Sequence, residues 1–245
     1  NVASKKTLNA KNLEELGAAR LSELMIEITR GDAEGKRRLR LELAGAQGSN
    51  ALAAEIRKRM VTIGRSRSFV EWDKIKKLIK DLDQQRIAIA TQVAKDNPVE
   101  ALDLLWRFMA LANSVFERCD DGSGRLVTVF HQAVDDLGEI AEASDPEPET
   151  LADQVHTALT ENDYGQCDYL IRSMTPALGA LGLEYLKQSF ITLSQAPLKK
   201  PRSEDREVIG YGSGGTIYAD DYTERRRDSI VNLALQKIAD AQGDV

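Results

Sequence analysis

The stretch WDKIKKLIKDLDQQRIAI, residues 72–89, is the most regularly patterned part of the chain. Its inward positions recur every three or four residues and carry one charge among them: Trp72, Ile75, Ile79, Leu82, Arg86 and Ile89. Because an α-helix has 3.6 residues per turn, this spacing places them on one face of a helix. The stretch therefore predicts an amphipathic helix, and both tryptophans of the chain, Trp72 and Trp106, are expected in the core.

The same spacing recurs along most of the chain, while alternation with the period of a β-strand is almost absent. It predicts further helices around residues 13–28, 39–43, 52–63, 102–116, 125–143, 151–160, 166–174, 176–194 and 222–241. Consecutive helices joined by short turns tend to lie antiparallel. We therefore predict an all-α fold of antiparallel helical hairpins, arranged either as a solenoid-like array similar to TPR or HEAT repeats or as an irregular helical bundle.

Helix boundaries are indicated by a few local signals. Asn12 followed by Glu15 is typical of a helix cap, and Asn97-Pro98 predicts one helix ending and another beginning. Thr175 is expected to separate two helices, the second of which starts at Pro176. Asp145-Pro146-Glu147-Pro148 is the best candidate boundary between two parts. We predict an N-terminal helical bundle or array over 1–145 and C-terminal hairpins over 146–245, with a long loop at 197–221.

Composition narrows the class of protein. Of the 245 residues, 42% are hydrophobic and 29% are charged, which is typical of a globular chain. The two cysteines are too few for a secreted disulfide scaffold. No apolar run approaches the roughly 20 residues that span a bilayer, and residues 1–12 lack the apolar core of a signal peptide. We expect a soluble cytoplasmic protein without a membrane partner.

Charge is distributed unevenly along the chain. The net charge of −6 argues against a protein built mainly to bind nucleic acid. Residues 36–80 nevertheless hold 13 lysines and arginines and four acids, a local charge of +9, whereas residues 120–163 hold 12 acids and one base, a local charge of −11. Both segments are interpreted first as solvated helix faces. A partner surface, or a contact between copies in a homo-oligomer, is the alternative.

The basic segment is the strongest candidate binding surface. If its helices stack, a stripe of cations could bind phosphates or an acidic partner. The residues chosen for this surface are Arg57, Lys58, Arg59, Arg65, Arg67, Lys74 and Lys77. The acidic total charge and the expected burial of both tryptophans, which would leave no aromatic platform, argue against nucleic acid.

Two other motifs give weaker evidence for a ligand or metal site. Residues 210–215 satisfy G-x-G-x-x-G, but the polar run before them cannot be the core strand that a dinucleotide site needs, so a surface loop or short hairpin is favoured. Cys119, His131, His156 and Cys167 lack the short paired spacings of a zinc site. No catalytic residue, metal or cofactor is therefore expected.

Several stretches together resemble a bacterial family known only as a domain of unknown function. The similarity rests on helix-packing patterns at Lys6–Leu13, Arg37–Leu43, Ser68–Trp72, Glu100–Phe108, Val115–Arg118 and Ile238–Val245. The chain is also distantly similar to the helical region that follows the zinc finger in SWIM-type proteins, although it lacks the zinc-finger cysteines. The resemblance implies no catalytic residues, and it implies that the chain is the N-terminal part of a longer solenoid.

From the residues we predict a non-enzymatic helical scaffold that binds another protein of unknown identity. Binding of nucleic acid or a phosphate ligand through residues 36–80 is the alternative, and an enzyme is the third possibility.

Overall fold

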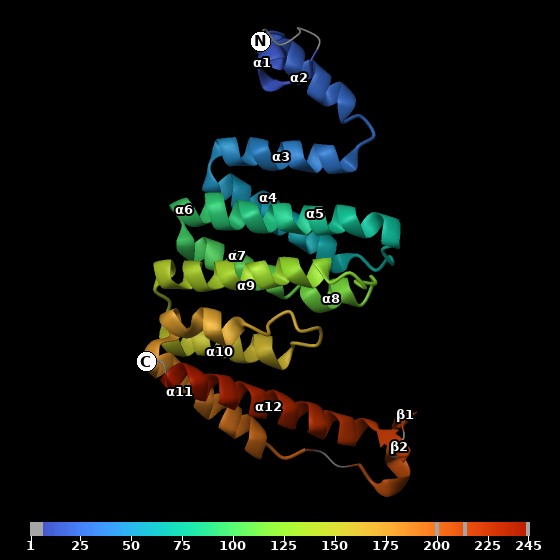
Figure 1. Cartoon of the computed structure of the whole chain (residues 1–245), viewed down its shortest axis with the longest axis vertical. Helices are drawn as coiled ribbons and strands as arrows, with labels where there is room; N and C mark the ends of the chain where they lie inside the picture. The colour runs from blue at the N-terminus through green and yellow to red at the C-terminus, as the bar shows by residue number, and fades with distance from the viewer. Residues whose placement is uncertain (1–6, 199–200, 213–214, 244–245) are drawn as a thin grey trace.

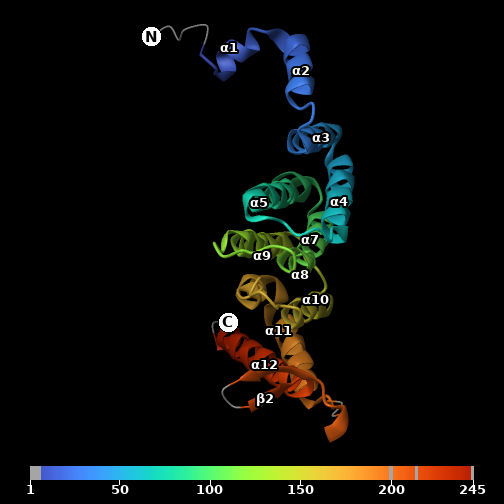
Figure 2. The same cartoon turned by 90° about the vertical axis from the view of Figure 1, so that its right-hand side faces the viewer.

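The computed structural model describes residues 7–198, 201–212 and 215–243 and is mostly helical, which confirms the all-α class. The helices are stacked in chain order along the long axis of the molecule (Figures 1 and 2). The elements are α1 (Ala10–Glu14), α2 (Gly17–Ile28), α3 (Ala33–Gln47), α4 (Ser49–Arg65), α5 (Trp72–Ala88), the π-helix η1 (Ile89–Val93), α6 (Ala94–Asp96), α7 (Pro98–Met109), α8 (Ala112–Phe116), α9 (Arg125–Ser144), α10 (Pro148–Thr160), α11 (Leu170–Gln195), the short 3₁₀-helix η2 (Ser203–Asp205), β1 (Val208–Gly212), β2 (Gly215–Tyr218) and α12 (Ala219–Gly243).

Apolar stripes that the sequence predicts form the core. All four stripe residues of α4 are buried: Leu52, Ile56, Met60 and Ile63. The buried side chains form one cluster from Leu41 to Ile238, which continues across residue 145 because α9 packs against α11. The division into two parts at residue 145 stays a prediction. The first two helices contribute no buried apolar side chain to this cluster and stand off from the rest (Figure 1).

Polar side chains fix the starts of the central helices. The Asn97 side chain accepts a hydrogen bond from the backbone N–H of Glu100, so the boundary predicted at Asn97-Pro98 is confirmed. The carboxylate of Asp121 accepts from the backbone N–H groups of Leu126 and Val127 at the start of α9. Asp121 therefore caps the start of α9 by accepting hydrogen bonds from two N–H groups that have no partner within the helix.

A buried carboxylate joins three helices in the first half. Asp81 of α5 is 3% exposed, and it accepts hydrogen bonds from Arg59 of α4 and lies 3.4 Å from Nε of Arg37 of α3. A carboxylate is rarely buried unless it is paired. This ion pair therefore fixes the relative position of α3, α4 and α5.

The predicted cap of the first helix and the predicted helix start at Pro176 are wrong. Asn9, not Asn12, caps the first helix, since its side chain accepts a hydrogen bond from the backbone N–H of Asn12. The helix is then interrupted between α1 and α2, where Gly17 has φ 76°. In the second half, α11 runs through Pro176, and its backbone becomes non-helical only at Gly179 (φ 56°, ψ −171°). A residue without Cβ adopts that left-handed conformation most easily, so the kink falls there.

Trp72 is 82% exposed, so its predicted place in the core is wrong. It is the first residue of α5, and a helical pattern does not show whether a neighbouring element extends far enough to cover such an end. Trp106 is partly buried and packs against the core.

The segment 197–221 contains more regular structure than the predicted loop. The strands β1 and β2 pair antiparallel, with Gly212 opposite Gly215, and α12 begins at Ala219 rather than Tyr222. Arg206 stabilises the start of α12, because its guanidinium binds the carboxylates of Asp220 and Asp221 and stacks over the ring of Tyr218. None of the helices in the described ranges is long and apolar enough to cross a membrane.

Candidate functional site

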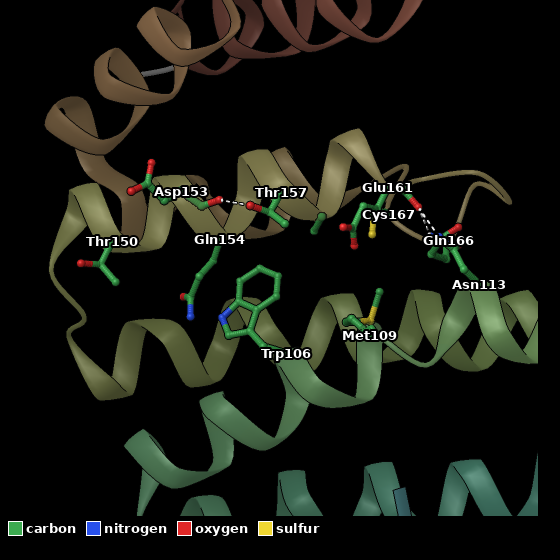
Figure 3. Close-up of a pocket in the computed structure, with 12 residues that line it drawn as sticks. Trp106, Met109, Asn113, Thr150, Asp153, Gln154, Thr157, Glu161, Gln166 and Cys167 are labelled. Atoms are coloured by element: carbon green, nitrogen blue, oxygen red, sulfur yellow. Dashed lines mark hydrogen bonds between the residues drawn. The ribbon is translucent and has the colours of Figure 1, made fainter. Parts of the chain in front are cut away.

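A half-open cleft of about 350 Å³ lies between α7 and α10 (Figure 3). The helix α7 and its turn into α8 form one wall, α10 forms the other, and the turn after α10 closes one end. The lining residues are Trp106, Met109, Ala110, Asn113, Thr150, Asp153, Gln154, Thr157, Ala158, Glu161, Gln166 and Cys167. The cleft is therefore built by segments about 40 to 60 positions apart in the sequence.

The floor of the cleft is apolar and its edges are polar. Trp106 and Met109 lie side by side on the α7 wall, and Gln154 reaches from α10 toward the indole ring (Figure 3). The indole N–H of Trp106 is shielded from solvent and has no hydrogen-bond acceptor among the described residues. A buried donor without an acceptor is costly, so this N–H is an unsatisfied polar group within the wall of the cleft.

Amide side chains fix the end of the cleft near Cys167. Asn113 of α8 and Gln166 both donate to the backbone carbonyl of Glu161, at 3.2 and 3.0 Å, and Gln166 also donates to Asn113 at 3.3 Å. These bonds tie the C-terminal end of α10 to α8. One end of the cleft is thus fixed by hydrogen bonds between these two helices.

The charged residues of the lining are both acidic. The carboxylate of Glu161 turns into the gap, whereas that of Asp153 points away from Trp106 at the outer rim (Figure 3). Both belong to the acidic segment 120–163. Of the described residues that line the cleft, none is a lysine, arginine or histidine. The cleft therefore favours a ligand with a positive group.

The thiol in the cleft is poorly suited to nucleophilic chemistry. Burial raises the pKa of Cys167 to about 12, so the thiol stays protonated at neutral pH, and only the thiolate is a strong nucleophile. Both histidines lie elsewhere: His131 contacts the Gly165 carbonyl at 2.9 Å, and His156 packs against Phe190. The described lining thus offers contacts for binding, and its thiol, Cys167, is not activated.

The cysteines and histidines of the chain are not grouped as a zinc site within the described residues. The Cys119 thiol donates to the Val115 carbonyl at the end of α8, and Cys167 lies in the cleft. In the part of the chain that the structure describes, no three or more His, Cys, Asp or Glu side chains are grouped so that they could hold a metal ion.

Two of the seven residues of the candidate basic surface are paired with acids of the same chain. Arg57 binds Glu100 and Asp103 of α7, and Arg59 binds Asp81 of α5, so both guanidiniums are already paired with acids of the same chain. The other members of the set are exposed: Lys58, Arg65, Arg67, Lys74 and Lys77. The cations of residues 36–80 that form ion pairs bind acids that lie outside residues 120–163. Among the described residues there is therefore no ion pair between the segment of charge +9 and the segment of charge −11.

The G-x-G-x-x-G segment lies in the β-hairpin. Gly210 and Gly212 belong to β1, and Gly215 starts β2, while residues 213 and 214 lie outside the described residues. No helix begins at the last glycine, because β2 intervenes before α12. The arrangement therefore differs from a dinucleotide-binding turn, in which a helix N-terminus faces the phosphates.

Sequence reasoning missed the cleft altogether. Its only visible signal was Trp106 in a strongly amphipathic helix, and the pattern could not show that α10 leaves part of that helix face uncovered. No curated protein and no solved structure shows significant similarity to the chain. Residues 3–245 match the model of a family described as "Family of unknown function (DUF6880)", and the chain belongs to that family.

Proposed function

We propose that the chain is a non-enzymatic helical scaffold that binds another protein, and that the α7–α10 cleft is where a segment of the partner docks. The observation that carries this proposal is a cleft with an apolar floor, a polar frame and an acidic edge. Ligand sites combine a mostly apolar lining with a few placed polar groups in this way.

A peptide segment matches the groups that the cleft offers. An apolar side chain of the partner would pack against the indole ring of Trp106 and against Met109 and Ala110. A lysine or arginine of the partner would pair with Glu161. Truncating a contact at such a buried aromatic anchor commonly weakens binding at least tenfold.

Selection of displayed peptides on the full chain tests this proposal. A library of random 12-residue peptides is selected on the wild-type protein and on Ala110→Trp, whose new indole would fill the cleft from an exposed position. We expect peptides that contain apolar and basic residues and that lose at least tenfold in affinity on the Ala110→Trp protein. Glu161→Gln is expected to weaken basic peptides only, and Tyr211→Ala, on β1 far along the chain, is the matched control.

Two results would contradict the proposal. The first is that no peptide is enriched on the wild-type protein; the second is that the enriched peptides bind the Ala110→Trp protein equally well. Circular dichroism must show that the variant keeps the helical content of the wild type, so that a loss of binding reports the cleft and not the fold.

The cellular location of the protein is part of the same proposal. We place it in the bacterial cytoplasm, and the two free, buried cysteines are compatible with a reducing compartment. We also propose that its helical hairpins are related to the helical region of SWIM-type proteins and act as a repeat array that presents the cleft.

A further inference from the structure

The turn between α4 and α5 exposes two large aromatic side chains. Phe69 is 60% exposed, and Trp72 is 82% exposed. They are three positions apart, at the end of the turn and at the first residue of α5. Single apolar residues on a surface are common, whereas two large exposed aromatic side chains this close in the sequence are a candidate interaction site, here called the platform.

The backbone that carries this platform is anchored. The N–H of Val70, which lies between the two aromatic residues in the sequence, donates to the carbonyl of Arg118 at 2.8 Å, and the Val70 side chain packs against the core. The Arg118 guanidinium in turn donates to the carbonyl of Ile63 at the end of α4. The rings are therefore held outward by a fixed turn, and their exposure does not result from a loosely packed segment.

Unpaired cations flank the two rings in the sequence. They are Arg65 and Arg67 before Phe69, and Lys74, Lys76 and Lys77 after Trp72. All five are exposed, and within the described residues none is engaged in an ion pair. Lys76 lies one helical turn from Trp72, on the same side of α5. Two acids, Glu71 and Asp73, flank Trp72, which leaves the local charge positive.

We infer that this α4–α5 turn binds single-stranded nucleic acid, with bases stacked on Phe69 and Trp72 and phosphates paired with the surrounding lysines and arginines. Proteins that bind single strands combine aromatic rings, on which any base can stack, with cations that follow the backbone. Two features of the sequence speak against nucleic acid: the acidic total charge, which remains, and the expected burial of both tryptophans, which the exposure of Trp72 overturns. This site is separate from the α7–α10 cleft.

A single strand fits these observations better than a duplex or a bilayer. The faces of stacked bases in a duplex are covered by their neighbours, so the rings would reach them only by unstacking a base step, which costs free energy. A flat anionic membrane would press Glu71 and Asp73 against its headgroups whenever Trp72 entered it. A strand is narrow, and it can contact the rings and the cations while both carboxylates stay in water.

Fluorescence anisotropy with labelled oligo(dT) and oligo(U), each about 20 nucleotides long, tests the inference on the full chain. We expect both oligonucleotides to bind, with an affinity that falls as salt rises from 50 to 200 mM, since phosphate contacts release counterions. Trp72→Ala and Phe69→Ala should each weaken binding roughly tenfold, which is within the range for one stacked base. The double variant Arg65→Glu/Arg67→Glu should weaken binding and flatten the salt dependence.

Matched controls come from the same chain. Tyr211→Ala removes an equally exposed aromatic ring on β1, and Lys95→Glu reverses an exposed charge on α6; both should leave the affinity unchanged. In the Trp106→Phe protein, in which Trp72 is the only tryptophan, saturating oligo(dT) should quench the remaining fluorescence, as direct stacking requires. Arg57 and Arg59 are unsuitable for charge reversal, because their ion pairs support the fold.

Three outcomes would overturn the inference: no binding at 50 mM salt, binding that Trp72→Ala and Phe69→Ala leave unchanged, or binding without quenching of Trp72. A fourth is selective binding to phosphatidylserine vesicles that depends on Trp72 while both oligonucleotides fail to bind, which would assign the turn to a membrane surface instead. A duplex that binds more tightly than either single strand would also contradict it.

Discussion

The guanidinium of Arg86 on α5 donates a hydrogen bond to the carboxylate of Asp136 on α9, with 2.7 Å between Nη1 and Oδ2. The two side chains are only 13% and 19% exposed, and Arg86 also binds Asp83 on its own helix. Arg86 is the charged residue that interrupts the apolar face of the 72–89 pattern. The interruption is therefore the point at which α5 is joined to the next layer of helices.

Replacing Arg86 by Met should destabilise the protein by about 2–4 kcal/mol, because Asp136 would remain partly buried without its partner. Burial already raises the pKa of Asp136, although the Arg86 guanidinium opposes that rise. Urea denaturation of Arg86→Met, Asp136→Asn and the double variant measures the coupling. We expect the double variant to lose less stability than the sum of the two single losses. Strict additivity would show that the pair is not coupled.

Gly138 allows α9 and α11 to approach each other closely. A Cβ at this position would collide with the backbone carbonyl oxygen of Ser173 on α11, and backbone cannot move aside as a side chain can. Gly138→Ala should therefore destabilise the protein by about 1–3 kcal/mol, even though alanine favours a helix by about 1 kcal/mol. Thermal and urea denaturation measure the difference.

Gly64 is the matched control for this prediction. It also lies within a helix, but a Cβ there would meet only the end of the Leu111 side chain, at 3.2 Å. Gly64→Ala is expected to be neutral or stabilising. If both substitutions changed stability by the same amount and in the same direction, the close approach of α9 and α11 would not be the cause.

The sequence predicted elements where one local pattern determines the outcome. The stripe from Leu52 to Ile63 is buried as expected, and the cap at Asn97 depends only on neighbouring residues. Trp72 was misplaced because its burial depends on how far other helices extend. The cleft could not be predicted for the same reason, since it exists only where Trp106 and Gln154, nearly fifty positions apart, face each other across a gap.

The contrast between the two tryptophans is directly measurable. Trp72→Phe leaves Trp106 as the single tryptophan, and Trp106→Phe leaves Trp72. We expect the Trp72 emission to resemble that of a solvated indole and to be strongly quenched by acrylamide, whereas Trp106 should emit at shorter wavelength and be quenched weakly, because it is partly buried against the core. Equal quenching of the two proteins would contradict the placement of Trp72 outside the core.

His156 should make the stability of the protein depend on pH. Its Nε2 is buried without a hydrogen-bond partner among the described residues, and burial lowers the pKa of the imidazole, although the charge of Asp153 opposes this. In the unfolded chain the pKa returns to about 6.5. Below that pH the unfolded state therefore binds a proton that the folded state does not. As the pH falls further, the free energy of unfolding decreases by at most about 1.4 kcal/mol per pH unit, until the pH reaches the pKa of His156 in the folded state.

Urea denaturation between pH 8 and pH 5 tests this contribution. The wild-type protein should lose stability as the pH falls below 6.5, and His156→Leu should lose less, since leucine fills the space beside Phe190 without titrating. Thr157→Ala, at an exposed position one residue away, keeps the imidazole and should keep the wild-type slope. If His156→Leu and wild type showed parallel curves over the whole range, His156 would be protonated equally in both states, and its burial against Phe190 would be refuted.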